Sequence, residues 1–134
     1  MIRYMLDTDT CISLLKARPE KISRRLSRLP VEDVGISSVV AAELWYGVAL
    51  SEKKKQNEAA LRDFLDFVKV IDWPGGACPV YGRIRAHLKK KGTPIGAMDL
   101  LIASHAAFFN AVLVTNNSRE FERVLDLKVE NWLA

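Results

Sequence analysis

Cysteine and long apolar segments are both scarce in this sequence. The only two cysteines, Cys11 and Cys78, form no Cys-x-x-Cys pair and have no histidine cluster beside them, which excludes a disulfide framework and a zinc ribbon. We therefore expect both to be small core residues. No run approaches the ~18 consecutive apolar residues of a membrane helix, which excludes a membrane protein.

The first residues also lack the features of a secretory signal. Residues 1–10 reach acidic side chains at once and contain no apolar segment followed by a small-residue cleavage site, so we expect a cytoplasmic protein. Repeats and linkers rich in Pro, Ser or Gly are absent as well. With 134 residues, 49% of them hydrophobic, the sequence predicts a single domain over residues 1–134.

Short apolar runs alternate with amphipathic segments along the chain. Residues 2–6 form an apolar run that polar residues end, which is typical of a strand buried on both faces. This alternation predicts an α/β three-layer sandwich with a central parallel sheet of four to five strands. Further strands are expected at 34–36, 68–71, 111–114 and 128–130, and helices at 10–17, 19–29, from Ser37 or Ser38 onward, and at 52–67, 77–91, 97–109 and 118–124.

Polar side chains follow two of the expected strands. Asp7 comes directly after the first strand, and Asn116 and Asn117 come after the strand at 111–114. In open parallel sheets, ligands bind outside the carboxyl ends of the strands, near the point where the strand order reverses. The two strand ends are therefore expected to bring oxygen ligands to the same edge of the sheet.

Two further acids lie on expected helices. Glu43 is too far along its helix to be a capping residue and has apolar neighbours, so its carboxylate is expected to lean inward. Asp99 lies among apolar residues near the start of its helix. Taken alone, Asp99 fits an aspartate that stabilises the helix dipole equally well, and Asp7 fits a turn residue. Only their joint occurrence favours a functional site.

Clustered carboxylates predict a cation. Two carboxylates ~4 Å apart repel by about 4 kcal/mol at an effective dielectric constant of ~20, so a fold that gathers three of them needs a cation or must protonate one. Oxygen ligands favour Mg²⁺ or Mn²⁺, and Mg²⁺ keeps most of its waters. Phosphodiester hydrolysis by one or two such ions is the chemistry that this site would support.

Four segments carry a resemblance to a known family. They are MLDTDT at the end of the first strand, ISSVVAAELWYG around Glu43, GTPIGAMDLLIASHA around Asp99, and VLVTNNSREFERV near the C-terminus. In this order, and over nearly the whole chain, they resemble the PIN-domain nucleases, specifically the VapC-type toxins of bacterial toxin–antitoxin pairs.

The resemblance implies a PIN-like nuclease domain that acts as the toxin of a type II toxin–antitoxin system. The implied activity is that of an endoribonuclease that depends on Mg²⁺, with Mn²⁺ as a substitute. Relatives cut structured RNA, often tRNA, so the expected effect is inhibition of translation and growth. Expected partners are RNA, a VapB-type antitoxin encoded beside the toxin and a second copy of the chain, in a homodimer and in a toxin–antitoxin hetero-oligomer.

The resemblance also implies roles for individual residues. It assigns metal ligation to Asp7 and Asp99, with Glu43 completing the acidic site directly or through a metal-bound water. Many relatives have a fourth acid where this sequence has Asn117. A second metal ion, if the site holds one, would therefore have one negative charge fewer to hold it.

Four neighbouring residues are expected to support these ligands through hydrogen bonds rather than to bind metal. Thr8 and Thr115 carry hydroxyl groups that can donate to the site, and Asn116 stands beside them. Asp9 stands where relatives usually have Asn. It fits either a residue that holds a metal-bound water or an aspartate at a helix start, and we expect the second.

Basic residues outnumber acidic ones by 20 to 16, which gives a formal net charge of +4 and permits a polyanionic partner. Any single basic cluster fits a solvated helix face, but three clusters together favour nucleic-acid contact. The expected RNA-binding residues are Arg83, Arg85, Lys89, Lys90 and Lys91.

Two other functions remain as alternatives. DTDT after a strand resembles the nucleophile motif of haloacid-dehalogenase phosphatases, but those enzymes need a lysine and an acidic pair after the threonine strand, and here Asp99 precedes Thr115. The other alternative is a non-catalytic RNA-binding module with the same fold. Three retained acids weigh against it, because a binder of polyanions gains nothing from gathered carboxylates.

Overall fold

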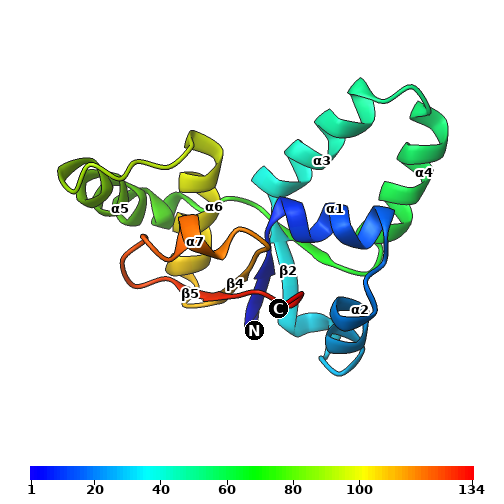
Figure 1. Cartoon of the computed structure of the whole chain (residues 1–134), viewed down its shortest axis with the longest axis horizontal. Coiled ribbons are helices and arrows are strands. Elements are labelled where there is room, and N and C mark those ends of the chain that lie inside the picture. The colour runs from blue at the N-terminus through cyan, green and yellow to red at the C-terminus, as the bar shows by residue number, and fades with distance from the viewer.

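The computed structural model describes residues Met1–Ala134 and is built around a five-stranded sheet with the strand order β3-β2-β1-β4-β5 (Figure 1). Every neighbouring pair of strands is parallel. The predicted parallel sheet is therefore confirmed, with five strands. Their bounds are β1 (Tyr4–Leu6), β2 (Val34–Ser37), β3 (Lys69–Ile71), β4 (Val112–Val114) and β5 (Lys128–Glu130).

The strand order reverses at the middle of the sheet. Met5 of β1 is paired with Gly35 of β2 on one side and with Leu113 of β4 on the other. Met5 and Leu113 are buried, as expected for strands covered on both faces. The carboxyl ends of β1 and β4 thus lie side by side at the position where open α/β sheets bind ligands.

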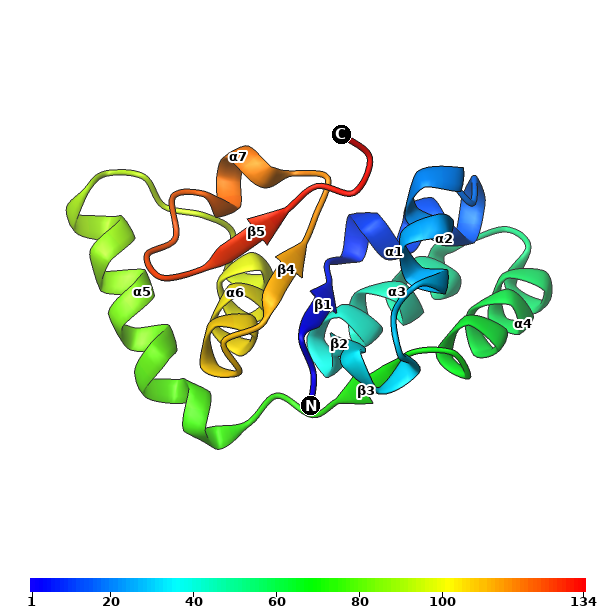
Figure 2. The ribbon, with the colours of Figure 1, turned by 90° about the horizontal axis from the view of Figure 1, so that it is seen from below.

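The helices form two groups. Figures 1 and 2 both place α1 to α4 on one side of β1 and α5 to α7 on the other. None of the helices is long and apolar enough to cross a membrane. Their bounds are α1 (Thr8–Lys16), α2 (Glu20–Ser27), α3 (Ser38–Leu50), α4 (Lys54–Leu65), α5 (Cys78–Lys90), α6 (Ala97–Phe108) and α7 (Ser118–Phe121), with 3₁₀ turns at Val31–Asp33 and Gly75–Ala77.

Helix boundaries differ from the sequence prediction in two places that affect the site. Helix α1 begins at Thr8 instead of residue 10, because Asp7 is its N-cap and accepts a hydrogen bond from the Thr8 backbone N–H. Helix α7 ends at Phe121, earlier than the expected residue 124. For α3, the structure decides between the two candidate caps in favour of Ser37, which accepts from the Val39 N–H.

The two cysteines lie in different environments. Cys11 is fully buried in the hydrophobic core, as predicted. Cys78 is exposed, so its prediction as a core residue was wrong. The physical reason is its place at the first residue of α5, where Ala77 just before it and Ile84 further along the helix supply the buried contacts instead.

Candidate active site

Asp7 lies at the centre of the site, between the ends of β1 and β4. Its side chain is only 5% exposed. Oδ1 accepts from the backbone N–H of Thr8 at 2.8 Å, and Oδ2 accepts from the Thr115 hydroxyl, also at 2.8 Å. One hydrogen bond comes from the helix that follows β1 and the other from the residue that follows β4. Together they fix the orientation of the carboxylate.

The charge of Asp7 is disfavoured in the folded protein. The pKa of its carboxyl is raised from 3.8 to about 6, first by burial and then by the neighbouring charges of Asp9 and Glu43. The hydrogen bonds from Thr115 and Thr8 act in the opposite direction, because they stabilise the ionised form. A cation bound beside Asp7 would remove this penalty.

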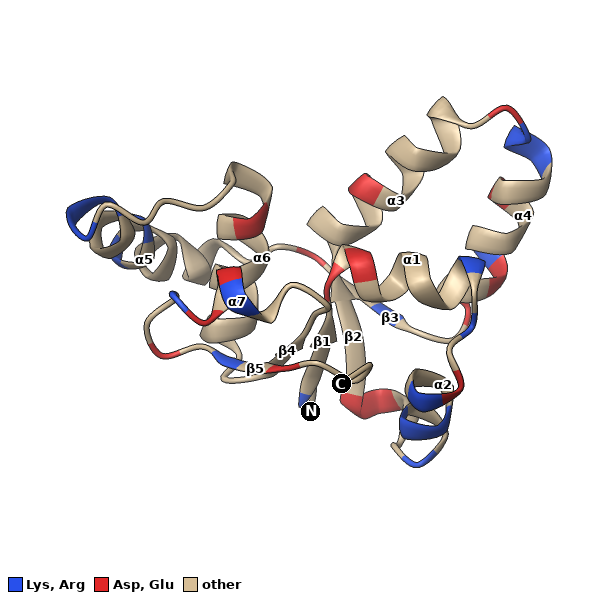
Figure 3. Cartoon of the chain, in the orientation of Figure 1, with Lys and Arg blue, Asp and Glu red and all other residues tan.

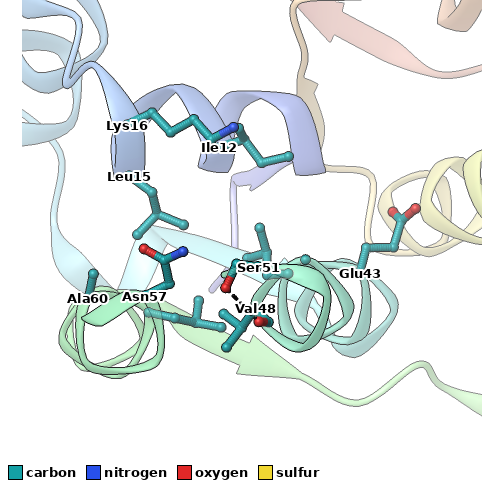
Figure 4. A pocket seen from close by; sticks show the side chains of 11 residues that line it. Ile12, Leu15, Lys16, Glu43, Val48, Ser51, Asn57 and Ala60 are labelled. Atoms are coloured by element: carbon teal, nitrogen blue, oxygen red, sulfur yellow. Dashed lines mark hydrogen bonds between the residues drawn. The ribbon is translucent and has the colours of Figure 1, made fainter. Parts of the chain in front are cut away.

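Glu43 reaches the same region from α3. The hydroxyl of Thr8 donates a 2.6 Å hydrogen bond to Glu43 Oε1, which connects the start of α1 to the middle of α3. In Figure 4, Glu43 extends from α3 away from Asn57 and Ala60 of α4. The Glu43 carboxylate is half-buried and is held against the start of α1 by Thr8.

Asp99 enters from the opposite group of helices. Its pKa lies well above the usual range, first because of burial, then because protonated Asp99 shares a hydrogen bond with Glu120 and feels its charge. The charges of Asp7 and Glu43 raise the pKa of Asp99 further. The three predicted acids are thus close enough to interact. Figure 3 shows acidic positions of α1, α3, α6 and α7 bordering the space between the two helix groups.

The sequence interpretation missed Glu120 as a member of this cluster. Glu120 lies in α7, and its Oε2 accepts a 2.7 Å hydrogen bond from Nδ2 of Asn117. Asn117 is exposed, and through this hydrogen bond it orients a carboxylate that lies about one helical turn further along. The contact between Asn117 and Glu120 is local, because residues three apart at a helix start lie on one face, whereas the contact between Glu120 and Asp99 depends on the fold.

Asp9 links α1 to the loop after β4. Its Oδ1 accepts from the backbone N–H of Asn116 at 3.1 Å, and both of its oxygens lie 3.4 Å from the Thr115 hydroxyl. Asp9 does lie in the first turn of α1, as expected, and it additionally holds this loop in place. Asn116 adds a second connection through Nδ2, which donates to Ser13 Oγ at 3.1 Å.

The donor set of this site fits a hydrated Mg²⁺ or Mn²⁺ better than a closed metal cage. No three His, Cys, Asp or Glu side chains converge closely enough to hold one ion together. Mg²⁺ needs only one or two carboxylates and retains several waters, which suits facing carboxylates on separate elements. The cluster offers oxygen atoms alone, which disfavours zinc. Burial first, and neighbouring carboxylates second, raise the pKa values of Asp7 and Asp99, and a bound cation would stabilise the ionised form of both.

The predicted RNA-binding residues lie on or directly after α5, away from the acidic centre (Figure 3). Helix α5 contains no acidic residue, and Arg83, Lys89 and Lys90 on it are exposed. Lys91 follows the helix and is exposed as well. Arg85 is oriented by Tyr81, since it donates to the Tyr81 hydroxyl at 2.9 Å and its guanidinium lies over the ring.

A groove of about 260 Å³ adjoins Glu43 on the opposite side of the molecule from α5 (Figure 4). It lies between α1, α3 and α4 and is lined mainly by apolar side chains. Among its lining residues are Ile12, Leu15, Gly47 and Ala60. The groove therefore offers an apolar surface that leads directly to the acidic cluster.

Comparisons with known proteins agree with this geometry. The family model described as PIN domain matches residues 4–126. Ribonuclease VapC2 of Rickettsia felis is 45% identical over 130 residues, covering 96% of this chain and 97% of that protein. A protein of Salmonella typhimurium named tRNA(fMet)-specific endonuclease VapC is 42% identical and covers 98% of this chain and 99% of its own length.

Solved structures give the same result. The crystal structure of VapBC2 from Rickettsia felis bound to a promoter DNA fragment contains a chain that matches with a TM-score of 0.93 at 45% identity, over 98% of this chain and 99% of that one. DNA-bound VapBC from Salmonella typhimurium matches with a TM-score of 0.94 at 42% identity, with the same coverage. The resemblance inferred from the four motifs is confirmed: the chain belongs to the PIN domain family, in its VapC branch.

Proposed function

We propose that this chain is a metal-dependent endoribonuclease and the toxin of a type II toxin–antitoxin pair, with residues 1–134 forming one nuclease domain that acts in the cytoplasm. One observation carries the proposal. Asp7, Glu43, Asp99 and Glu120 come from four different elements and influence one another at the point where the strand order reverses. Relatives over the full chain are named ribonucleases, which supports the same chemistry.

In this proposal Asp7 and Asp99 are metal ligands, and Glu43 and Glu120 complete the acidic site. A bound Mg²⁺ would lower the pKa of a water nucleophile and polarise the scissile phosphate. The chain's own groups hold the carboxylates in place. Thr115 orients Asp7, Thr8 orients Glu43, and Asn117 orients Glu120.

We propose structured RNA, tRNA in particular, as the substrate. The relative in Salmonella typhimurium is named a tRNA(fMet)-specific endonuclease. Helix α5 supports RNA binding, because its unopposed positive charges can contact phosphates on either side of a cut site. The basic end of α5 is followed, after residues 91–96, by α6, which begins two residues before Asp99.

We further propose that a VapB-type antitoxin covers the groove beside Glu43 and places a cation near the carboxylates. Solved relatives are VapBC complexes, and an arginine suits bidentate pairing with a carboxylate. The free toxin is proposed to be a homodimer. Tyr46 and Leu50 support this, because they are 65% and 67% exposed on α3, whereas Trp45 packs against the core beneath Arg62.

Induction of the chain alone should arrest growth and produce new RNA ends at a few sites in tRNA, which sequencing of 5′ ends after a brief induction would map. Induction of Asp7→Asn should leave growth and RNA ends unchanged, and co-expression with the neighbouring antitoxin gene should restore growth and yield a complex. A harmless, strictly monomeric protein with no such partner would contradict the proposed function.

Removing the positive charge of α5 should weaken RNA binding. The triple variant Lys89→Ala, Lys90→Ala, Lys91→Ala is expected to bind an uncleavable tRNA more weakly than wild type does. The slope of log K against log salt concentration should become shallower by about 0.7 for each lost phosphate contact, the value for single-stranded nucleic acid. Fluorescence anisotropy over a range of salt concentrations measures both quantities. The matched control removes three charges from α2 and its C-cap (Lys21, Arg24 and Arg28 to Ala). Equal losses in both variants would show that net charge alone governs binding.

A further inference from the structure

A buried hydrogen bond joins the two helices that carry Glu43 and Asp99. Nδ1 of His105 on α6 lies 2.8 Å from Oγ of Ser37, and both side chains are fully buried. Ser37 ends β2 and caps α3, where its Oγ also accepts from the Val39 N–H at 3.1 Å. The bond therefore connects the N-cap of α3 to the last turn of α6.

The His105 ring is neutral and holds one proton. Burial lowers the pKa of His105 to about 4, so its imidazole is neutral at physiological pH. Ser37 Oγ accepts from the Val39 N–H and keeps both a second lone pair and a hydroxyl hydrogen, so it can pair with Nδ1 of His105 in either tautomer. In both tautomers Nε2 is buried and has no partner among the protein's own atoms.

Stability alone does not account for a histidine at this position. A buried polar group without a partner costs about 1–3 kcal/mol, and the rest of the surrounding core is largely apolar. An apolar side chain of similar size would avoid that cost. What an apolar side chain cannot provide is a directional contact with Ser37.

A second polar bridge joins the same two helices. The backbone N–H of Trp73, in the connection after β3, donates to Ser38 Oγ at 3.0 Å, and its indole N–H donates to the Leu101 carbonyl of α6 at 2.8 Å. Apolar packing between helices is non-directional, so it permits sliding and rotation. Two directional bridges at the same end of the α3–α6 contact restrict both the sliding and the rotation of the two helices.

Glu43 and Asp99 each lie a short way along their helix from the Ser37–His105 hydrogen bond. Glu43 comes six residues after Ser37, and Asp99 comes six residues before His105. Six residues correspond to about 9 Å along a helix. A change in the relative rotation of the helices at the bridge is therefore carried to both carboxylates.

We propose that His105 is a positioning residue of the acidic site: its hydrogen bond to Ser37 sets the rotation and spacing of α3 and α6, and thereby the separation of Glu43 and Asp99. The effect of His105 on RNA cleavage rests on the proposed nuclease function. The effect of His105 on the arrangement of α3 and α6 does not.

Two isosteric variants test the proposal. Asn and Leu have the same branched shape, but only Asn places a polar atom where Nδ1 stands and can bond to Ser37. His105→Leu should be at least as stable as His105→Asn, since it buries no additional polar atom. It should nevertheless lower kcat and the affinity for Mg²⁺ by about 10- to 100-fold with KM for RNA unchanged, whereas His105→Asn should retain both. A purely structural role predicts that activity follows stability instead.

A metal-free measurement separates this proposal from the nuclease function. Spin labels at Ala49→Cys on α3 and Met98→Cys on α6, in a Cys78→Ser background, report the distance between the helices. His105→Leu should shift or broaden the distance distribution, and His105→Asn should match wild type. If these changes occur in a protein that neither binds Mg²⁺ nor cleaves RNA, the nuclease proposal fails and the positioning role stands.

A control variant and a fallback variant complete the test of His105. Ser104→Ala removes a buried hydroxyl that bonds only to the Leu100 carbonyl within α6, so it should leave the distances and kcat unchanged. Should His105→Leu fail to fold, His105→Gln replaces it, because its amide lies at the place of Nε2 and does not reach Ser37. A folded Leu or Gln variant with wild-type distances, Mg²⁺ affinity and kcat would overturn the proposal.

Discussion

Asp7→Asn and Asp99→Asn should each reduce RNA cleavage by about 10³-fold. Each substitution removes one negative charge from the site that is proposed to hold the metal, without changing the volume of the side chain. Metal ions stabilise transition-state charge by several kcal/mol, and a loss of about 4 kcal/mol corresponds to roughly 10³ in rate. Single-turnover cleavage of tRNA at saturating Mg²⁺ measures the effect on chemistry without the contribution of product release.

The matched control is Asp72→Asn. Asp72 follows β3 at the same carboxyl edge of the sheet, but it is exposed and takes no part in the acidic cluster. The Asp72→Asn variant should cleave RNA at the wild-type rate. Circular dichroism should show that all three variants are folded. A folded Asp99→Asn protein with full activity would remove Asp99 from the proposed site.

The second large effect is on stability, and its sign depends on the metal. In EDTA at pH 7.5, Asp7→Asn should unfold at a higher temperature than wild type. Wild-type Asp7 is ionised there although burial and neighbouring acids disfavour its charge. We expect the free energy of unfolding to rise by about 1–2 kcal/mol. This is less than the rise in pKa from 3.8 to about 6 would give at ~1.4 kcal/mol per unit, because the substitution also weakens the hydrogen bonds from Thr8 and Thr115.

The pH dependence of this gain follows from linkage. The pKa of Asp7 is about 6 in the folded protein and 3.8 ordinarily, so its contribution to wild-type stability is fully present below about pH 4 and is lost as pH rises through about 6. The advantage of Asp7→Asn in EDTA should therefore be large at pH 7.5 and small at pH 4 to 5. Differential scanning fluorimetry of both proteins at these pH values measures it.

Added Mg²⁺ should reverse the order of the two proteins. Wild type gains binding free energy that the variant lacks, since a ligand that binds only the folded state stabilises it. If Asp7→Asn unfolds below wild type in EDTA at pH 7.5, Asp7 acts mainly as an acceptor for Thr8 and Thr115. The excess of negative charge would then not be the main property of the site.

The sequence pattern predicted the parts of the site that follow directly from strand ends. Asp7 ends a short apolar run, and the loop at residues 115–117 ends another, so their meeting at one edge follows from parallel pairing. Glu43 was found because a carboxylate among apolar neighbours on a helix must lean towards a polar site. These inferences need only local periodicity and the rules for parallel sheets.

The parts that sequence reasoning missed depend on contacts between distant elements. Glu120 belongs to the site because α7 follows β4 after the short loop at residues 115–117 and places Glu120 beside Asp99. A helix of four residues has too few positions to show a period. His105 lies 68 residues from Ser37, and nothing in the local pattern distinguishes it from an ordinary core histidine.

Metal dependence of RNA cleavage tests the central claim most directly. The purified chain, freed of its antitoxin, is incubated with tRNA in EDTA and then in increasing concentrations of Mg²⁺ or Mn²⁺, with Asp7→Asn as the background control. The gathered carboxylates of Asp7, Glu43, Asp99 and Glu120 predict no cleavage in EDTA and full recovery with either ion. Cleavage by wild type that is undiminished in EDTA would contradict the account.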